Sequence, residues 1–132
     1  MIKFKYPEAA QRMFNKIYLG LQAQGWKQSK GNVGGKVKCA YRGDDNRKCA
    51  IGHLIEDDHY KPLIENFSIG YDAVRLAVMR SQNLNEQKMQ DLQDLLSILQ
   101  RAHDHRDNPE AMQQAFQHEA EFHGLQIPET KA

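Results

Sequence analysis

Apolar residues recur every three or four positions in three stretches of the chain, and this spacing is typical of helices with one buried face. The first predicted helix begins at Pro7, because proline is favoured at the first helical position, and ends at Gly25. The second is expected from about Tyr71 to Gln82. The third lies within residues 83–107 and has the most regular apolar stripe, formed by Met89, Leu92, Leu96, Leu99 and His103.

A fourth helix is predicted from the residues that flank its ends. Asn108 can cap the helix, Pro109 would be its first residue, and Gly124 would end it. Beyond it the chain continues as a short tail, residues 125–132. No internal repeat or long linker divides the sequence, so we expect residues 1–132 to form a single domain.

The segment between the first two helices favours β-structure. Residues 28–38 (QSKGNVGGKVK) are glycine-rich and are predicted to form a mobile loop that leads into a strand. Residues 35–43 (GKVKCAYRG) alternate as a strand does, and GDDN is a strong turn sequence. Residues 47–55 (RKCAIGHLI) would return as the second strand or open a short helix. The expected fold class is α+β and helix-dominated, with about four main helices packed around a small two-stranded β-hairpin.

Charge and hydropathy restrict the partners to expect. The 18 basic and 17 acidic side chains give a formal net charge of +1, which argues against nucleic-acid binding through bulk electrostatics. Trp26 lies near a local basic loop that could bind a single strand, but we favour a solvated loop with Trp26 packed against the first helix. No apolar run is long enough to cross a membrane, and the first residues lack the apolar region of a signal peptide. We therefore expect a cytoplasmic protein without a membrane partner.

Residues 38–55 (KCAYRGDDNRKCAIGHLI) contain the candidate chemistry. Cys39, Cys49 and His53 are ligand types that zinc accepts. However, the spacing C-x9-C-x3-H differs from the C-x2-C knuckle of common zinc sites, and the chain has only two thiols. No cofactor is therefore expected, with zinc as the less favoured alternative. In that alternative the fourth ligand would be His59, Asp57 or Asp58.

A thiol nucleophile is the second chemical alternative. Cys49 would need a base, which His53 or His103 could supply. Asp104 is expected to be badly placed to orient His103, since adjacent helix positions point about 100° apart. We instead expect His103 at the edge of the core, bonded to a backbone carbonyl.

His118 and His123 invite comparison with a zinc-protease helix. In that motif the two histidines are four residues apart and share one face of the helix. Here they are five residues apart, so we expect both on a solvated surface.

The favoured interpretation of the motif is structural. Its small Cys, Ala and Gly residues would let a hairpin lie close under a helix, because free cysteine behaves as a small apolar residue. Loop length leaves open whether Cys39 pairs with Cys49 across the strands or faces the other side. Arg42 would fasten the corner by pairing with Asp44, Asp57 or Asp104. The residues assigned to this corner are Cys39, Tyr41, Arg42, Gly43, Cys49, Gly52, His103 and Asp104.

The same motif resembles one in small uncharacterised phage and prophage proteins. Residues 39–43 match C-x-Y-R-G, and residues 48–55 match K-C-A-x-G-x-L-I. Leu99–Asp104 and Phe122–Leu125 are similar to the downstream L-Q-x-x-H-D and H-G-L of that group. One departure is Glu56, where the family has proline, and this weakens the prediction of a turn there. The resemblance implies a viral protein that acts inside a bacterial host cell.

These observations favour a protein-binding function without catalysis. We expect an accessory protein that binds a host protein and inhibits or redirects it, for example in a restriction, exclusion or recombination system. The alternatives are a zinc-stabilised nucleic-acid-binding module and a thiol-dependent enzyme. Exposed apolar residues would form the interface and could also support a homodimer. The candidate interface residues are Tyr71, Val74, Val78, Met79, Leu125 and Ile127.

Overall fold

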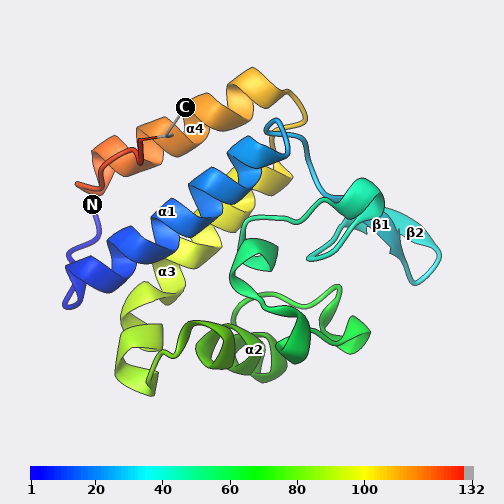
Figure 1. The fold of residues 1–132 in the computed structure, drawn as a ribbon, viewed down its shortest axis with the longest axis horizontal. Coiled ribbons are helices and arrows are strands. Elements are labelled where there is room, and N and C mark those ends of the chain that lie inside the picture. The colour runs from blue at the N-terminus through cyan, green and yellow to red at the C-terminus, as the bar shows by residue number, and fades with distance from the viewer. Residues whose placement is uncertain (130–132) are drawn as a thin grey trace.

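The computed structural model describes residues 1–129, which fold into four α-helices and one two-stranded hairpin together with short 3-10 turns (Figure 1). The predicted helix-dominated α+β class is therefore confirmed. The helices are α1 (Pro7–Ala23), α2 (Asp72–Gln82), α3 (Glu86–Asp104) and α4 (Pro109–Phe122), and the strands are β1 (Lys30–Val33) and β2 (Lys36–Cys39). Short 3-10 turns follow at Asp44–Asn46, Ile51–Leu54, Asp57–His59 and Pro62–Ile64.

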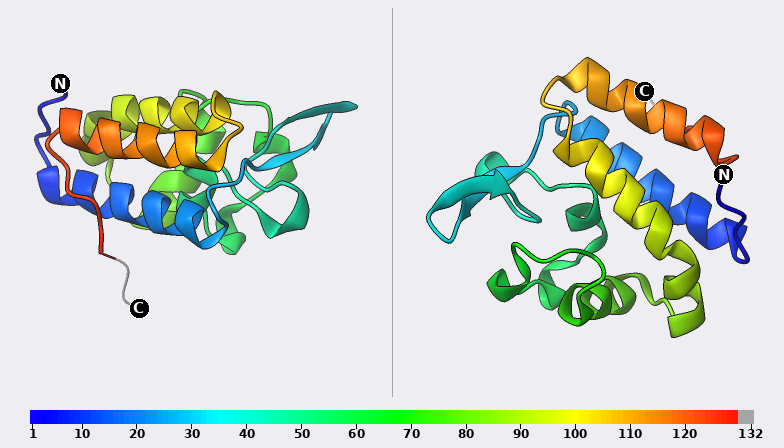
Figure 2. Two further views of the ribbon diagram at one scale, coloured as in Figure 1. Left: turned by 90° about the horizontal axis from the view of Figure 1, so that it is seen from above. Right: turned by 180° about the vertical axis from the view of Figure 1, so that it is seen from behind.

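Helices α1, α3 and α4 lie side by side, and α2 lies on the side of α1 and α3 that is opposite α4 (Figures 1 and 2). The main core lies where their apolar faces meet. Phe14 of α1 and Phe116 of α4 are both fully buried, with ring centroids 6.5 Å apart. The stripe predicted for the third helix is buried along its whole length, including His103.

Trp26 packs into the core beside α1, as predicted, and is not available for stacking on a base. Its ring meets the ring of Tyr18 edge-on, with centroids 4.7 Å apart. Helix α1 ends at Ala23, two residues before the predicted end, and Gly25 and Trp26 then adopt positive φ angles of 71° and 59°. The backbone N–H of Trp26 donates to the carbonyl of Leu21 at 2.8 Å. This bond turns the chain so that the indole packs back onto the helix.

The predicted cap of α4 is confirmed. The side chain of Asn108 accepts a hydrogen bond from the Ala111 N–H at 3.1 Å, and Pro109 is the first helical residue. The helix ends at Phe122, before Gly124, which has a φ of 71°.

The hairpin lies at a different place from the one predicted. Residues 28–38 do not form a loop that precedes the hairpin, because they contain β1 and most of β2. Gly34 and Gly35, with φ of 60° and 85°, join the strands in the left-handed turn that suits a two-residue hairpin. Cys39 accordingly pairs with Lys30. The hairpin projects from one edge of the molecule (Figure 1).

The predicted turn GDDN does not connect two strands. Only an isolated bridge between Arg42 and Lys48 flanks it, and Ile51–Leu54 is a 3-10 helix. This outcome corresponds to the second of the two predicted alternatives, a short helix. A helical turn buries both Ile51 and Leu54 completely, whereas a strand would alternate between core and solvent.

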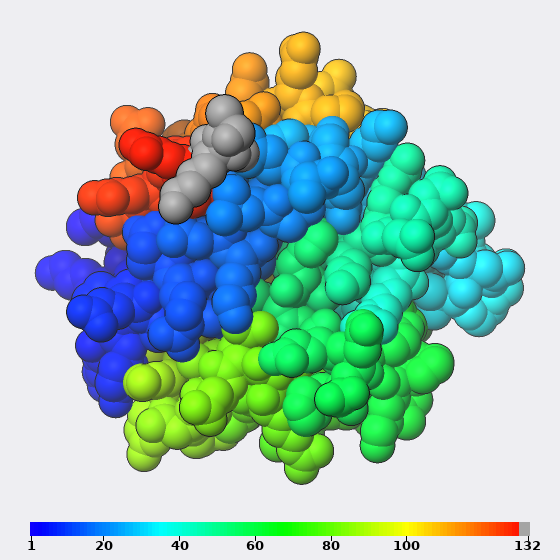
Figure 3. Space-filling model, viewed as in Figure 1, coloured from blue at the N-terminus to red at the C-terminus, as the bar shows by residue number. Residues whose placement is uncertain are grey.

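The tail after α4 lies along the molecule as far as it is described. Leu125 packs against the core, and Gln126 exchanges two hydrogen bonds with the side chain of Gln11 at 2.8 and 2.9 Å. In Figure 3 this red segment lies against α1. Residues 130–132 of the predicted tail lie outside the described residues. Among residues 1–129, no helix combines the length and apolar character needed to span a membrane.

Candidate functional site

The motif residues converge on a corner where β2, Ile51–Leu54 and the C-terminal turn of α3 meet. Glu65 holds one side of this corner. Its carboxylate accepts the backbone N–H groups of Tyr41 and Arg42 at 2.8 and 3.1 Å and the hydroxyl of Tyr60 at 2.7 Å. The Tyr41 hydroxyl donates to the carbonyl of Phe67. Glu65 was not identified from the sequence, because it lies outside the motif and outside every apolar stripe.

Arg42 fastens the same side through its guanidinium. It forms an ion pair with Asp57 at 2.5 Å, which confirms one of the three predicted partners. Its guanidinium lies 4.4 Å from the centroid of the Tyr60 ring, and Nη2 donates to the carbonyl of Ile55 at 3.3 Å. The planar guanidinium therefore joins the Arg42 segment to residues 55–60 through three contacts.

His103 fastens the other side of the corner, and its environment differs from the prediction. The ring is fully buried, and Nε2 accepts the backbone N–H of Ser29 at 3.0 Å. Because Nε2 accepts, the proton of the neutral ring lies on Nδ1, which donates to Asp104 Oδ1 at 2.9 Å. Two predictions were therefore wrong: His103 does not bond a backbone carbonyl, and Asp104 does orient it. Although adjacent helix positions point about 100° apart, Nδ1 of His103 lies near the backbone and within reach of the short Asp104 carboxylate.

Gln100 and Gln28 extend this network. Gln100 Nε2 donates to Asp104 Oδ1 at 2.8 Å, while its Oε1 accepts the Ile51 N–H at 2.9 Å. Gln28 Nε2 donates to the last carbonyls of α3, those of His103 and Asp104, each at 3.0 Å. Neither glutamine was identified from the sequence, because amide side chains are frequent throughout this chain. The C-terminal turn of α3 is thereby bonded to two segments that are distant in sequence.

Cys39 and Cys49 line a cavity of about 570 Å³, together with Tyr41 and Asp104. The cysteines are not bonded to each other. Burial and the neighbouring charge of Asp104 raise the pKa of Cys39 to about 11, and burial also raises the pKa of Cys49. Both thiols are therefore protonated at neutral pH, which opposes a role as thiolate nucleophile.

The structure does not bring together the predicted zinc ligands Cys39, Cys49, His53 and His59. Within residues 1–129, the group with ligand atoms close enough to hold a metal consists of Cys39, His103 and Asp104, whose ligand atoms lie within 4.8 Å of one another. A metal on Nδ1 of His103 would require the ring proton on Nε2, which faces the Ser29 N–H. The observed hydrogen bonds therefore favour a protonated network at these three residues.

His53 packs against α1 with its ring over Gly20, and Nε2 lies 3.0 Å from Oε1 of Gln24. Burial, with a smaller contribution from the charge of Lys48, lowers the pKa of His53 to about 4. Between pH 6.5 and 4 the unfolded chain therefore takes up a proton here that the folded chain does not. We expect stability to fall as pH decreases through this interval, by up to about 1.4 kcal/mol per pH unit.

The variant His53→Gln tests this expectation. The loss of unfolding free energy between pH 6.5 and 4.5, measured by urea denaturation, should be smaller in the variant by about 2 kcal/mol. His118→Gln is the matched control, because His118 is exposed, and it should keep the wild-type pH dependence. Equal pH dependence in wild type and His53→Gln would contradict the expectation.

The predicted interface residues divide into two groups. Val74 and Val78 are fully buried and do not form an exposed surface, whereas Met79 and Leu125 are partly buried and pack against the core. Helix α2 buries the face that carries Val74 and Val78, because this face covers the Ile51–Leu54 turn.

Tyr71 and Ile127 are exposed, as predicted. Tyr71 stacks on Phe67 with ring centroids 4.2 Å apart, and the two residues are 47% and 43% exposed. The homodimer stays a prediction.

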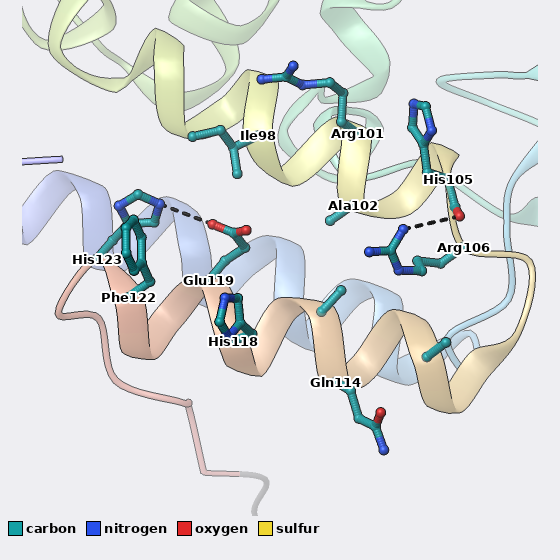
Figure 4. Close-up of a pocket in the computed structure, with 12 residues that line it drawn as sticks. Ile98, Arg101, Ala102, His105, Arg106, Gln114, His118, Glu119, Phe122 and His123 are labelled. Carbon is teal, nitrogen blue, oxygen red and sulfur yellow. Dashed lines mark hydrogen bonds and ion pairs between the residues drawn. The ribbon is translucent and has the colours of Figure 1, made fainter. Parts of the chain in front are cut away.

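A second hollow, of about 840 Å³, lies between α3 and α4 (Figure 4). His118 is exposed beside it, as predicted, whereas His123 is buried. His123 Nδ1 accepts the Ile2 N–H at 3.0 Å and Nε2 donates to Glu119 at 3.0 Å, so it joins the N-terminal segment to α4. The prediction for His123 was wrong because the chain's own N-terminal segment covers this turn.

No family model, curated protein or solved structure matches this chain. The resemblance to phage proteins therefore stays a prediction.

Proposed function

We propose that this chain is a phage-type accessory protein that binds a protein of its bacterial host and inhibits or redirects it. It would act in the host cytoplasm, in a counter-defence or host-takeover role. The observation that carries the proposal is the exposed aromatic pair of Phe67 and Tyr71 beside the corner cavity.

The aromatic pair has the properties of an interface anchor. Large aromatic side chains supply much of the binding energy of protein interfaces, and they lose little conformational freedom on binding. The rings are already stacked at an interplanar angle of 14°, and the hydrogen bond from Tyr41 holds the Phe67 backbone in place. Little further ordering would therefore be needed when a partner covers them.

The cavity next to Phe67 offers a place for a side chain of the partner. Its wall combines apolar atoms of Ile69 and Phe67 with polar groups of Ser97 and Asp94. A pocket of about 570 Å³ beside an exposed aromatic pair is typical of a binding surface with one buried anchor.

The internal bonding of the corner supports binding over catalysis. His103 uses both ring nitrogens in hydrogen bonds to the protein, and the pKa values of both cysteines are raised. The residue types that could have formed a nucleophile and base instead lie within the corner, and Tyr41, whose backbone Glu65 holds, positions Phe67.

Affinity purification from bacterial lysate tests the proposal. The wild-type chain should recover one dominant host protein. The double variant Phe67→Ala/Tyr71→Ala should bind the purified partner on the order of 100-fold more weakly, as expected for the loss of two aromatic anchors. Leu76→Ala is the matched control, because Leu76 is 44% exposed on α2, and it should bind as wild type does.

Two results would refute the proposal. One is recovery of nucleic acid with no protein. The other is a partner whose affinity is the same for the wild-type chain and the double variant. Circular dichroism of each variant establishes that the fold is retained before affinities are compared.

A further inference from the structure

We propose that the groove between α3 and α4 binds an amphipathic helix of a partner protein whose flanks are acidic. This groove and the corner cavity lie on different sides of α3. Ile98, Ala102 and His105 face the groove, while Ser97 and Gln100 line the cavity, and Arg101 borders both. The inference therefore concerns a second surface and does not depend on the aromatic pair.

The two flanks of α4 differ in what covers them. On the side of α1, the chain's own tail covers the junction, with Leu125 against the core and Gln126 bonded to Gln11. On the side of α3, the N-terminal segment crosses from His123 of the α4 end to Asp91 of α3 and so closes one end of the junction. The rest of the junction is open along the described chain (Figures 2 and 4). Helices α1, α3 and α4 thus present an open groove between two of three packed helices.

The dimensions and lining of the groove suit a helix. Ala111, Ala115 and Phe122 line it from one face of α4, and at 1.5 Å per residue this row is about 16 Å long. That length corresponds to roughly three turns of a bound helix. Ala102 and Ile98 line the opposite wall, so the middle of the groove is apolar and its small side chains permit close approach. An amphipathic helix would place its apolar face here.

The basic residues around the groove favour acidic side chains on the flanks of a bound helix. Arg106 lies between the two helices, whereas the side chain of Arg101, at the outer edge, extends from α3 away from α4 (Figure 4). His105 and His118 flank the groove as well. Glu119 is the only acidic residue in the lining that the structure describes, and it is bonded to His123. The basic charges are therefore available to acidic side chains of a bound helix.

The same charges disfavour two other occupants. A second copy of this chain placed groove to groove would bring Arg106 against its own counterpart. Nucleic acid would use the arginines but not the apolar floor, and it favours an extended basic surface that this neutral chain does not supply.

Designed peptides test the inference with the full chain. The probe is a fluorescently labelled 16-residue helix of about four turns, with leucine on one face and glutamate on its flanks. The comparison probes are the same peptide with lysine in place of glutamate and a single-stranded DNA oligonucleotide. We expect the acidic peptide to bind at least about 10-fold more tightly than the basic one, and added salt to weaken its binding.

Groove variants assign the binding to this surface. Arg106→Glu and Ala115→Glu should each weaken binding of the acidic peptide by about 10-fold or more. Arg80→Glu, an exposed charge reversal on α2, is the matched control and should bind as wild type does, as should Phe67→Ala/Tyr71→Ala. Equal binding of acidic and basic peptides, preference for the oligonucleotide, no binding of the acidic peptide, or unchanged binding by Arg106→Glu would each overturn the inference. Because Arg106 is exposed, its variant tests the groove even if Ala115→Glu does not fold.

Discussion

Replacement of Gly52 by alanine should lower the free energy of unfolding by about 3 kcal/mol. A Cβ at this position would overlap the carbonyl oxygen of Tyr41 and lie 3.2 Å from the Cβ of Lys48. The Tyr41 carbonyl belongs to backbone that Glu65 holds through the N–H groups of Tyr41 and Arg42, so it has little freedom to move away. The added methyl group would therefore separate the 3-10 turn from the strand segment, and urea denaturation measures the loss.

Gly70→Ala is the matched control for this experiment. Gly70 is exposed and does not have a positive φ, and the closest heavy atoms to an added Cβ are 3.7 Å away, which is ordinary van der Waals contact. Stability should stay the same or rise by about 0.5 kcal/mol, because alanine restricts the unfolded chain. Equal effects of the two substitutions would show that the close approach at Gly52 does not constrain the corner.

Replacement of His103 by leucine should also cost about 3 kcal/mol. Leucine preserves most of the buried volume but cannot accept the N–H of Ser29, a residue that is fully buried. It also removes the proton donated to Asp104, whose carboxylate would keep Gln100 as a hydrogen-bond donor. The unsatisfied Ser29 N–H dominates the cost, since a buried donor without an acceptor loses its hydration without compensation.

The neighbouring His105→Leu provides the control. His105 is exposed at the end of α3 and should tolerate the substitution within about 0.5 kcal/mol. In the wild-type chain, nitrogen-15 NMR should report the His103 ring with its proton on Nδ1. A wild-type level of stability in His103→Leu, or a ring proton on Nε2, would contradict the network described for the corner.

The helical part of this fold could be predicted from the sequence because its information is local. The stripe from Met89 to His103 repeats with the period of a helix, and Asn108 followed by Pro109 is a sufficient start for α4. Each of these patterns lies within one helix or at its end. No distant contact was needed to interpret them.

The hairpin shows where local patterns competed. Residues 28–38 and the GDDN segment both carried turn residues, and the structure forms the two-residue hairpin turn at Gly34 and Gly35. Two consecutive glycines can both adopt positive φ without strain, which a two-residue hairpin turn requires. The second turn remains, but it leads into a 3-10 helix because Ile51 and Leu54 are buried together.

The amino-acid pattern was sufficient to predict the helices, the fold class and the motif residues of the corner, because periodicity, caps and motif spacing are properties of short segments. It did not identify Glu65, Gln28 or Gln100, and the contacts of the corner residues became clear only from the folded chain. Ser29 and Gln28 reach the end of α3 across more than 70 positions of the chain, and Glu65 reaches Tyr41 across 24. Tertiary packing also decided that Val74 and Val78 are core residues while Phe67 and Tyr71 are exposed. Such assignments depend on which distant segments pack together, and no pattern within a single segment specifies that.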